Sequence, residues 1–154
     1  MHDLKRKNFE EAHPEVPFPQ IDALSDDEAR ELRIRIARRL GCPEDDGLML
    51  VRSLSARSVP VEGVNAESEH FKLLGTLWSL RLRPEQPTVY VNWYRFDQID
   101  RVNLEELARY FGDLWYPSSD DIDIFDDTCD WILSVGHSGD VRIAQLGVRR
   151  TVGA

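Results

Sequence analysis

An α+β fold, with an antiparallel sheet of about five to six strands packed against two main helices, is the architecture that the sequence predicts. Two observations carry this prediction. Two amphipathic segments begin with helix-capping residues, and several short apolar segments lie between turn-forming residues. Period-two alternation on both sides of a short Pro-containing loop is typical of antiparallel strands, which favours an antiparallel sheet.

The chain of 154 residues is long enough for one domain, and we divide it into three parts. Residues 1–20 are expected to form an extended N-terminal arm, because Pro14, Pro17 and Pro19 disfavour a continuous helix. Residues 21–146 are expected to form the single α+β domain. Residues 147–154 are expected to be a frayed tail.

The two helices are predicted from their caps. Ser25 and Glu28 have the spacing of a capping box, and Gly41 is placed to end the helix that begins there. Asn103 can cap a second helix over residues 104–114, which carries an apolar stripe at helical spacing. These two segments are the main helices of the expected fold.

Strands are predicted where short apolar or alternating segments lie between turn formers. The expected strands are residues 47–54, 76–83, 88–94, 122–125, 131–135 and 141–146. Residues 76–83 and 88–94 alternate on either side of a short Pro-containing loop, which predicts a hairpin. Residues 59–65 contain a proline and a glycine and are expected to be a loop, and residues 66–74 are expected to be a short helix.

The negative charge of the chain is concentrated in residues 97–130. This segment contains 11 acidic and two basic residues, so its net charge of −9 equals that of the whole chain. Binding to nucleic acid or to an anionic membrane requires clustered Lys and Arg, and an acidic segment opposes both. We therefore expect no nucleic acid and no membrane partner, and a basic protein or a cation as the natural complement.

The compartment is predicted from what the chain lacks. No apolar run approaches the ~20 residues that cross a bilayer, and the first 20 residues have no apolar core of a secretory signal. These features predict a cytoplasmic protein. In that compartment Cys42 and Cys129 are expected to be free thiols, with a disulfide between them as the alternative.

Five aspartates within eight residues are candidate ligands for a divalent cation: Asp120, Asp121, Asp123, Asp126 and Asp127. Asp121 and Asp123 match the start of a calcium-binding loop. The match then ends, because Phe125 stands at the next ligand position and neither the turn glycine nor the closing glutamate follows. We therefore assign no metal ligand and no cofactor.

A hydrolase based on carboxylates and a histidine is a second possibility. Two carboxylates in one pocket can divide into an acid and a base, and His137 can act as a general base that Asp130 or Asp140 orients. The serines of this region lack the surroundings of a nucleophile elbow, and Cys129 lacks those of a cysteine hydrolase. We therefore assign no catalytic residue, and a hydrolase or a cation-binding protein remains the alternative function.

Aromatic residues between the carboxylates favour protein recognition. An acidic surface speeds association with a basic partner, while aromatic anchors supply affinity. The predicted contact surface consists of Trp115, Tyr116, Asp120, Asp121, Asp123, Asp126 and Asp127. The alternative is that the aromatic residues belong to the core and the aspartates to turns and a solvated face.

The segment from Val91 to Ile143 contains NWYRFD, LARYFGDLWYPSSDDIDIFDD and DWILSVGHSGDVRI, and it resembles small bacterial proteins that end in a helix, a Trp-Tyr-Pro-Ser-Ser-Asp-Asp turn and a Trp/His hairpin. In size, acidity and α+β design the chain is similar to immunity proteins of bacterial polymorphic-toxin systems. This resemblance implies a non-enzymatic protein that neutralises a basic toxin, such as a nuclease, by blocking its active site or its access to substrate.

Overall fold

The computed structural model describes residues 3–147. Its helices are α1 (Asp3–Ala12), α2 (Asp26–Leu40), α3 (Gly47–Arg57), α4 (Leu73–Ser79), α5 (Leu104–Arg109) and α6 (Phe111–Leu114). Its strands are β1 (Ile21–Ala23), β2 (Val59–Asn65), β3 (Thr88–Tyr94), β4 (Gln98–Asn103), β5 (Ile122–Phe125), β6 (Trp131–Val135) and β7 (Asp140–Gln145).

The strands form one antiparallel sheet in the order β1-β4-β3-β5-β6-β7-β2. The predicted α+β class with an antiparallel sheet is confirmed. Within residues 3–147 the sheet has seven strands rather than five or six, and six helices accompany it rather than two.

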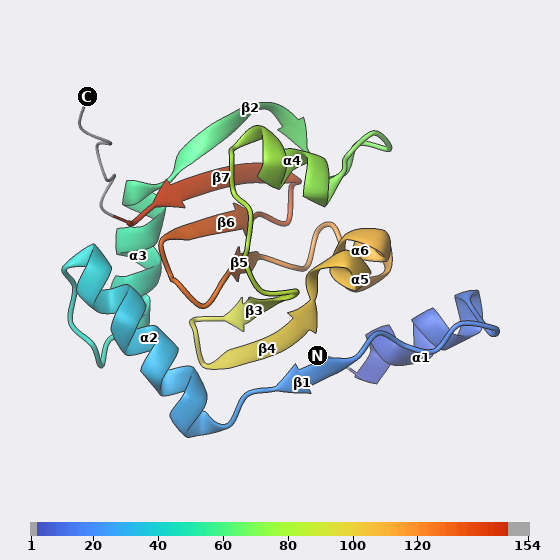
Figure 1. Ribbon diagram of the computed structural model, residues 1–154, viewed down its shortest axis with the longest axis horizontal. Helices are drawn as coiled ribbons and strands as arrows, with labels where there is room; N and C mark the ends of the chain where they lie inside the picture. Colours follow the sequence, from blue (N-terminus) through green and yellow to red (C-terminus); the bar gives the residue numbers. More distant parts are fainter. Residues whose placement is uncertain (1–2, 148–154) are drawn as a thin grey trace.

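Helices cover both faces of the sheet. The buried residues of α2 and α3 pack on one face, and those of α4, α5 and α6 pack on the other. Figure 1 shows α2 and α3 to the left of the sheet and α5 and α6 to its right. Strand alternation divides β6 accordingly, because Trp131 and Leu133 join the cluster of α4 to α6, whereas Ile132 joins that of α2 and α3.

Both predicted caps are present. The Ser25 hydroxyl accepts from the Glu28 N–H, the Glu28 carboxylate accepts from the Ser25 N–H, and Gly41 ends α2 with a φ of 69°. The Asn103 side chain accepts from the Glu106 N–H and caps α5. The second helix is shorter than predicted, because the chain leaves helical geometry at Tyr110 before α6 begins.

Residues 47–54, predicted as a strand, belong to helix α3. The Asp46 carboxylate accepts a hydrogen bond from the Met49 N–H and caps this helix, while Leu50 and Leu54, four residues apart, face the core. A short apolar run fits a buried strand and a buried helix equally well, and the Asp46 cap is the local feature that favours the helix.

The predicted hairpin of residues 76–83 and 88–94 is also wrong in its first half. Residues 73–79 form α4, and Trp78 on this helix is 49% exposed. Strand β3 matches residues 88–94 but pairs with β4 and β5, of which β4 was not predicted.

Residues 59–65, expected to be a loop, form the edge strand β2. Of residues 66–74, expected to be a short helix, only Leu73 and Leu74 are helical, because turns precede α4, which begins at Leu73. Pro60 and Gly63 are compatible with β2 because it pairs only with β7, with a shift of register between Pro60 and Asn65. Strands β5 and β6 match their predicted ranges, and β7 lies one residue earlier than predicted.

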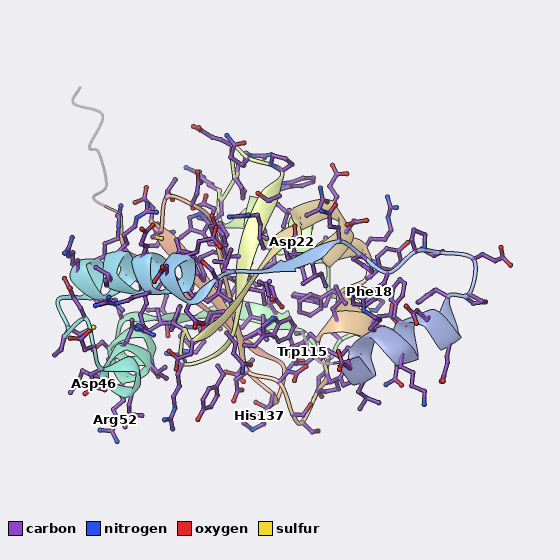
Figure 2. The ribbon with its side chains drawn as sticks, turned by 90° about the horizontal axis from the view of Figure 1, so that it is seen from below. Phe18, Asp22, Asp46, Arg52, Trp115 and His137 are labelled. Atoms are coloured by element: carbon purple, nitrogen blue, oxygen red, sulfur yellow. The ribbon has the colours of Figure 1, made fainter. Side chains whose placement is uncertain are left out.

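The N-terminal arm is not extended throughout, because Asp3–Ala12 is helical. The three prolines all follow this helix, so they limit its end and not its formation. Figures 1 and 2 both show α1 at one end of the molecule and α2 with α3 at the other. The predicted frayed tail lies outside the described residues except for Gly147.

None of the helices within residues 3–147 has the length and the apolar character needed to cross a membrane.

Candidate binding site

The seven predicted contact residues do not share one surface. The side chains of Trp115 and Asp126 are buried, with 2% and 5% of their surface exposed. Tyr116, Asp120 and Asp123 are partly buried, and Asp121 and Asp127 are exposed. The acidic segment therefore contributes to the interior as well as to the surface.

Asp126 holds the turn between β5 and β6 together. Its carboxylate accepts hydrogen bonds from the Trp131 indole N–H at 3.1 Å, from the Thr128 N–H at 3.1 Å and from the Thr128 hydroxyl. Because the carboxylate is buried and satisfied within the fold, Asp126 does not contact a partner in this conformation.

Asp123 lies on β5 between two neighbouring strands. It accepts from the Ser134 hydroxyl at 2.6 Å and from the Asn92 amide at 2.9 Å. Burial raises the pKa of the Asp123 carboxyl, more than these hydrogen bonds lower it. Asp123 therefore joins β3, β5 and β6 through polar contacts.

Trp115 is a core residue. Its ring stacks on Phe111 with centroids 5.7 Å apart, and its indole N–H donates to the Asp120 carbonyl at 3.0 Å. The predicted aromatic anchor thus fixes the loop that carries Asp120 and is not open to a partner.

Asp121 orients His137. Its carboxylate accepts from the His137 N–H at 2.8 Å and lies 2.8 Å from the His137 Nδ1. The prediction that Asp130 or Asp140 orients this ring is therefore wrong, because Asp130 pairs with Arg39 and Asp140 accepts from Ser138. Both side chains of the Asp121–His137 pair are exposed, and Figure 2 shows His137 at the lower edge of the molecule.

Tyr116 and Asp120 of the acidic segment contact a lysine that sequence reasoning missed. Lys5 of α1 is 6% exposed, and its Nζ lies 4.6 Å from the ring centroid of Trp93 and 4.5 Å from that of Tyr116. The same ammonium donates to the Leu114 carbonyl at 2.6 Å and forms an ion pair with Asp120. We call Trp93, Leu114, Tyr116 and Asp120 the Lys5 cage.

The members of the cage are held by the fold. The Leu114 carbonyl is among the last of α6, where carbonyl groups have no partner within the helix. Asp120 also accepts from the Tyr116 N–H at 2.8 Å, and the Trp93 indole donates to Asp100 at 2.8 Å. The ring of Tyr116 is fixed in turn by a hydrogen bond of 3.0 Å from the Asn8 amide to its hydroxyl.

Burial is the largest influence on the Lys5 ammonium and lowers its pKa. The hydrogen bond and the charge of Asp120 act in the opposite direction. The cage therefore stabilises a cation that the surrounding protein otherwise disfavours.

A hollow of about 620 Å³ adjoins the cage. Its aspartates are Asp3, Asp26, Asp97, Asp100 and Asp120. They come from α1, from α2, from the β3–β4 connection, from β4 and from the loop before β5, and the ring of Trp93 also lines the hollow. We call this feature the acidic hollow. Arg33 pairs with Asp97 and is a countercharge at its edge.

A second hollow, of about 460 Å³, lies beside β1, β4 and α5. Its lining mixes Arg101 and Arg109 with Glu105 and Glu106. Because both signs of charge are present, this hollow does not select a ligand of one charge. The acidic hollow and the Lys5 cage are therefore the better candidate site.

The two cysteines and the possible metal ligands do not form a second candidate site within the described residues. Cys42 and Cys129 are both free thiols, and burial raises the pKa of Cys129 to about 11, which suppresses its reactivity. Within the described residues, no three His, Cys, Asp or Glu side chains gather in a group that could hold a metal ion.

Sequence reasoning missed this site because its parts are distant in the chain. Lys5 is 115 residues from Asp120 and 109 from Leu114. The one local signal was the mixed aromatic and acidic composition of residues 115–121. Comparisons with protein families, with curated proteins and with solved structures found no match to this chain.

Proposed function

We propose that this chain is a non-enzymatic protein-binding module that takes a basic partner at the acidic hollow. The single observation that carries this proposal is the convergence of five aspartates from separate segments around one hollow, beside a cage that already holds an ammonium group. Such a surface suits a partner that presents Lys or Arg side chains.

The roles within the surface follow from exposure. Asp3, Asp26 and Asp97 are exposed and supply a negative potential that accelerates the approach of a basic protein. Trp93 and Tyr116 are partly buried aromatic residues of the type that carries affinity in protein interfaces. Of the other residues predicted from sequence, Asp121 and Asp127 are exposed and extend the negative surface, whereas Trp115, Asp123 and Asp126 support the fold.

An immunity protein is the specific form of this proposal. Its partner would be a toxin domain with a basic active site, such as a nuclease, and the acidic hollow would cover that site. The support is the excess of negative charge together with the resemblance in size and α+β design described above.

The test uses the purified product of the adjacent reading frame, because immunity proteins are normally encoded beside their toxins. Association with the intact chain is measured by stopped flow over a range of salt concentrations. The double variant Asp3→Asn/Asp26→Asn should associate about 5-fold more slowly and show a weaker salt dependence. Its melting temperature reports whether the fold is retained.

The matched control is the double variant Asp45→Asn/Glu62→Gln. It removes the same charge from two exposed side chains, one beyond the far end of α2 and the other on β2, the edge strand opposite β1. The control should associate as the parent does. Equal rates for both double variants would remove the acidic hollow from the interface.

A hydrolase is the second candidate, and one observation favours it. Asp121 holds the His137 ring at 2.8 Å, an arrangement in which a histidine can act as a general base. The variant His137→Asn should then abolish hydrolysis in a screen of ester and phosphoester substrates, with and without EDTA. A screen in which the parent chain has no activity removes this candidate.

A further inference from the structure

Helix α1 presents one charged side chain to the interior. Of its ten residues only Lys5 and Phe9 are buried. The Lys5 ammonium lies between two aromatic rings, a carboxylate and a carbonyl, which is the environment of a bound ligand more than that of a surface ion pair.

We propose that the Lys5 cage is a binding site for a primary ammonium group, which Lys5 fills in the free protein and which a lysine of the basic partner occupies when α1 is displaced. This inference rests on the proposed function and deepens it. It names lysine as the recognised side chain and α1 as its intramolecular competitor.

The chemistry of the cage matches an ammonium group. The Leu114 carbonyl and the Asp120 carboxylate accept two of its three N–H donors. The faces of Trp93 and Tyr116, each within 4.6 Å of Nζ, stabilise the remaining positive charge. A neutral group of the same size forgoes both the ion pair and the cation–π contacts.

Besides Lys5, helix α1 is attached through Phe9, through His13 and through the hydrogen bond from Asn8 to the Tyr116 hydroxyl. Phe9 packs edge-on against Phe18 and Tyr110, with centroids 5.3 and 5.0 Å apart, and His13 lies 3.0 Å from Asp113. The helix lies at the end of the molecule, where Figure 2 labels Phe18 beside it, and a proline-rich segment connects it to β1. Because α1 pairs with no strand, its displacement exposes Phe9 but leaves the hydrogen bonds of the sheet intact.

The identity of residue 5 also indicates recognition. Removing an ammonium group from water costs several kcal/mol, and an apolar side chain in the same position often serves stability equally well. A lysine surrounded by aromatic rings adds specificity for a cation instead. An incoming lysine bears the same cost of burial, so it can replace Lys5 only where the partner also gains contacts in the acidic hollow.

A route to the cage exists. Trp93 and Asp120 of the cage also line the acidic hollow, and so does Lys5, which fills the cage. A lysine side chain that the hollow attracts therefore reaches the cage directly, without crossing either hydrophobic cluster. The hollow attracts the cation, and the cage binds its ammonium group.

The first experiment empties the cage in the full chain with Lys5→Ala and adds n-propylammonium, which replaces the deleted atoms. We expect a rise in melting temperature that grows with concentration, and a shift of the Trp93 indole N–H signal in the NMR spectrum. The matched control, Lys7→Ala, truncates an exposed lysine of the same helix and should show neither effect. The parent chain should also show neither, because Lys5 fills its cage.

Two comparisons decide the result. 1-Propanol, which is neutral, should not reproduce the effect of n-propylammonium, and Lys5→Ala/Asp120→Asn should abolish it. An equal response to 1-propanol, or an equal response of Lys7→Ala, overturns the ammonium site.

The second experiment uses the parent chain and depends on no variant. A ten-residue oligolysine peptide should increase hydrogen exchange of the α1 amides about tenfold while the β5 and β6 amides remain protected. Unchanged α1 exchange while the peptide is bound overturns the displacement of α1.

The two proposals fail separately. If n-propylammonium stabilises Lys5→Ala but the parent chain binds no basic protein, the ammonium site is supported and the proposed function is contradicted. If association with the basic partner depends on Asp3 and Asp26 but n-propylammonium does not stabilise Lys5→Ala, the proposed function is supported and the ammonium site is contradicted.

Discussion

The two halves of the aspartate cluster at residues 120–127 use the same residue type in different ways. In the first half, Asp120 and Asp121 face basic side chains from distant parts of the chain, Lys5 and His137. In the second half, Asp123 and Asp126 accept hydrogen bonds only from neutral groups of neighbouring strands and turns. One half contacts basic side chains of distant elements, and the other half connects neighbouring strands and turns.

This difference shows that the spacing of aspartates along the sequence does not determine the structural role of each one. Asp120 and Asp126 are both removed from most of the solvent, yet the first pairs with an ammonium group, whereas the second accepts hydrogen bonds from an indole and a threonine. What distinguishes them is the element packed against each. Helix α1 brings a charge to Asp120, whereas β6 brings the neutral donor of Trp131 to Asp126.

The largest effect is expected in the second half, for Asp126→Ala. This change leaves the buried Trp131 indole N–H and the Thr128 N–H without their acceptor, which should lower the free energy of unfolding by about 3 kcal/mol. Chemical denaturation measures it. The adjacent Asp127→Ala, at an exposed side chain, is the control and should stay within about 0.5 kcal/mol of the parent.

The next effect is expected in the first half, for Asp120→Asn. The amide keeps the shape of the carboxylate but removes the countercharge of the buried Lys5, so α1 should detach more often while the sheet persists. We expect a loss of about 2 kcal/mol, confined to α1. Hydrogen exchange should be faster in α1 and unchanged in β5 and β6. A uniform increase over all these elements would mean that Asp120 supports the whole fold.

Asp123 provides a test by pH. Because its pKa is higher in the folded protein than in the unfolded chain, the unfolded chain loses this proton first as pH rises from about 3.9. The free energy of unfolding of the parent should therefore fall, relative to that of Asp123→Asn, from this pH up to the folded pKa, and the difference should then stay constant. Denaturation curves across this range measure it. A difference that does not change with pH contradicts the raised pKa.

Much of the fold was accessible from sequence where the signal is local. Ser25 and Glu28 each accept a hydrogen bond from the other's backbone N–H within one helical turn, and the Asn103 side chain accepts from the Glu106 N–H. Both caps are confirmed. The apolar run at residues 47–54 predicts a strand but forms a helix, because its periodicity fits both. The signal for the helix is Asp46, which caps it.

The candidate site was less accessible because it depends on distant contacts. No local pattern distinguishes Lys5, which is buried, from Lys7, which is exposed on the same helix. Trp115 has the composition of an interface anchor, and only its stacking on Phe111 places it in the core. Sequence located the acidic segment, whereas tertiary packing decided which of its carboxylates face solvent.

The smallest effect is expected for Asp121→Asn, in the first half but at the surface. Its partner His137 is exposed, and exposed ion pairs contribute about 0.2 to 1 kcal/mol. The amide oxygen can still accept from the His137 N–H, so we expect a loss of at most about 0.5 kcal/mol in the free energy of unfolding, measured by chemical denaturation. Asp120 and Asp121 are adjacent in sequence, so a contrast between their asparagine variants reports the different partners and burial of the two carboxylates. A loss at Asp121 as large as that at Asp120 would mean that negative charge in this loop, and not the buried lysine, holds α1 in place.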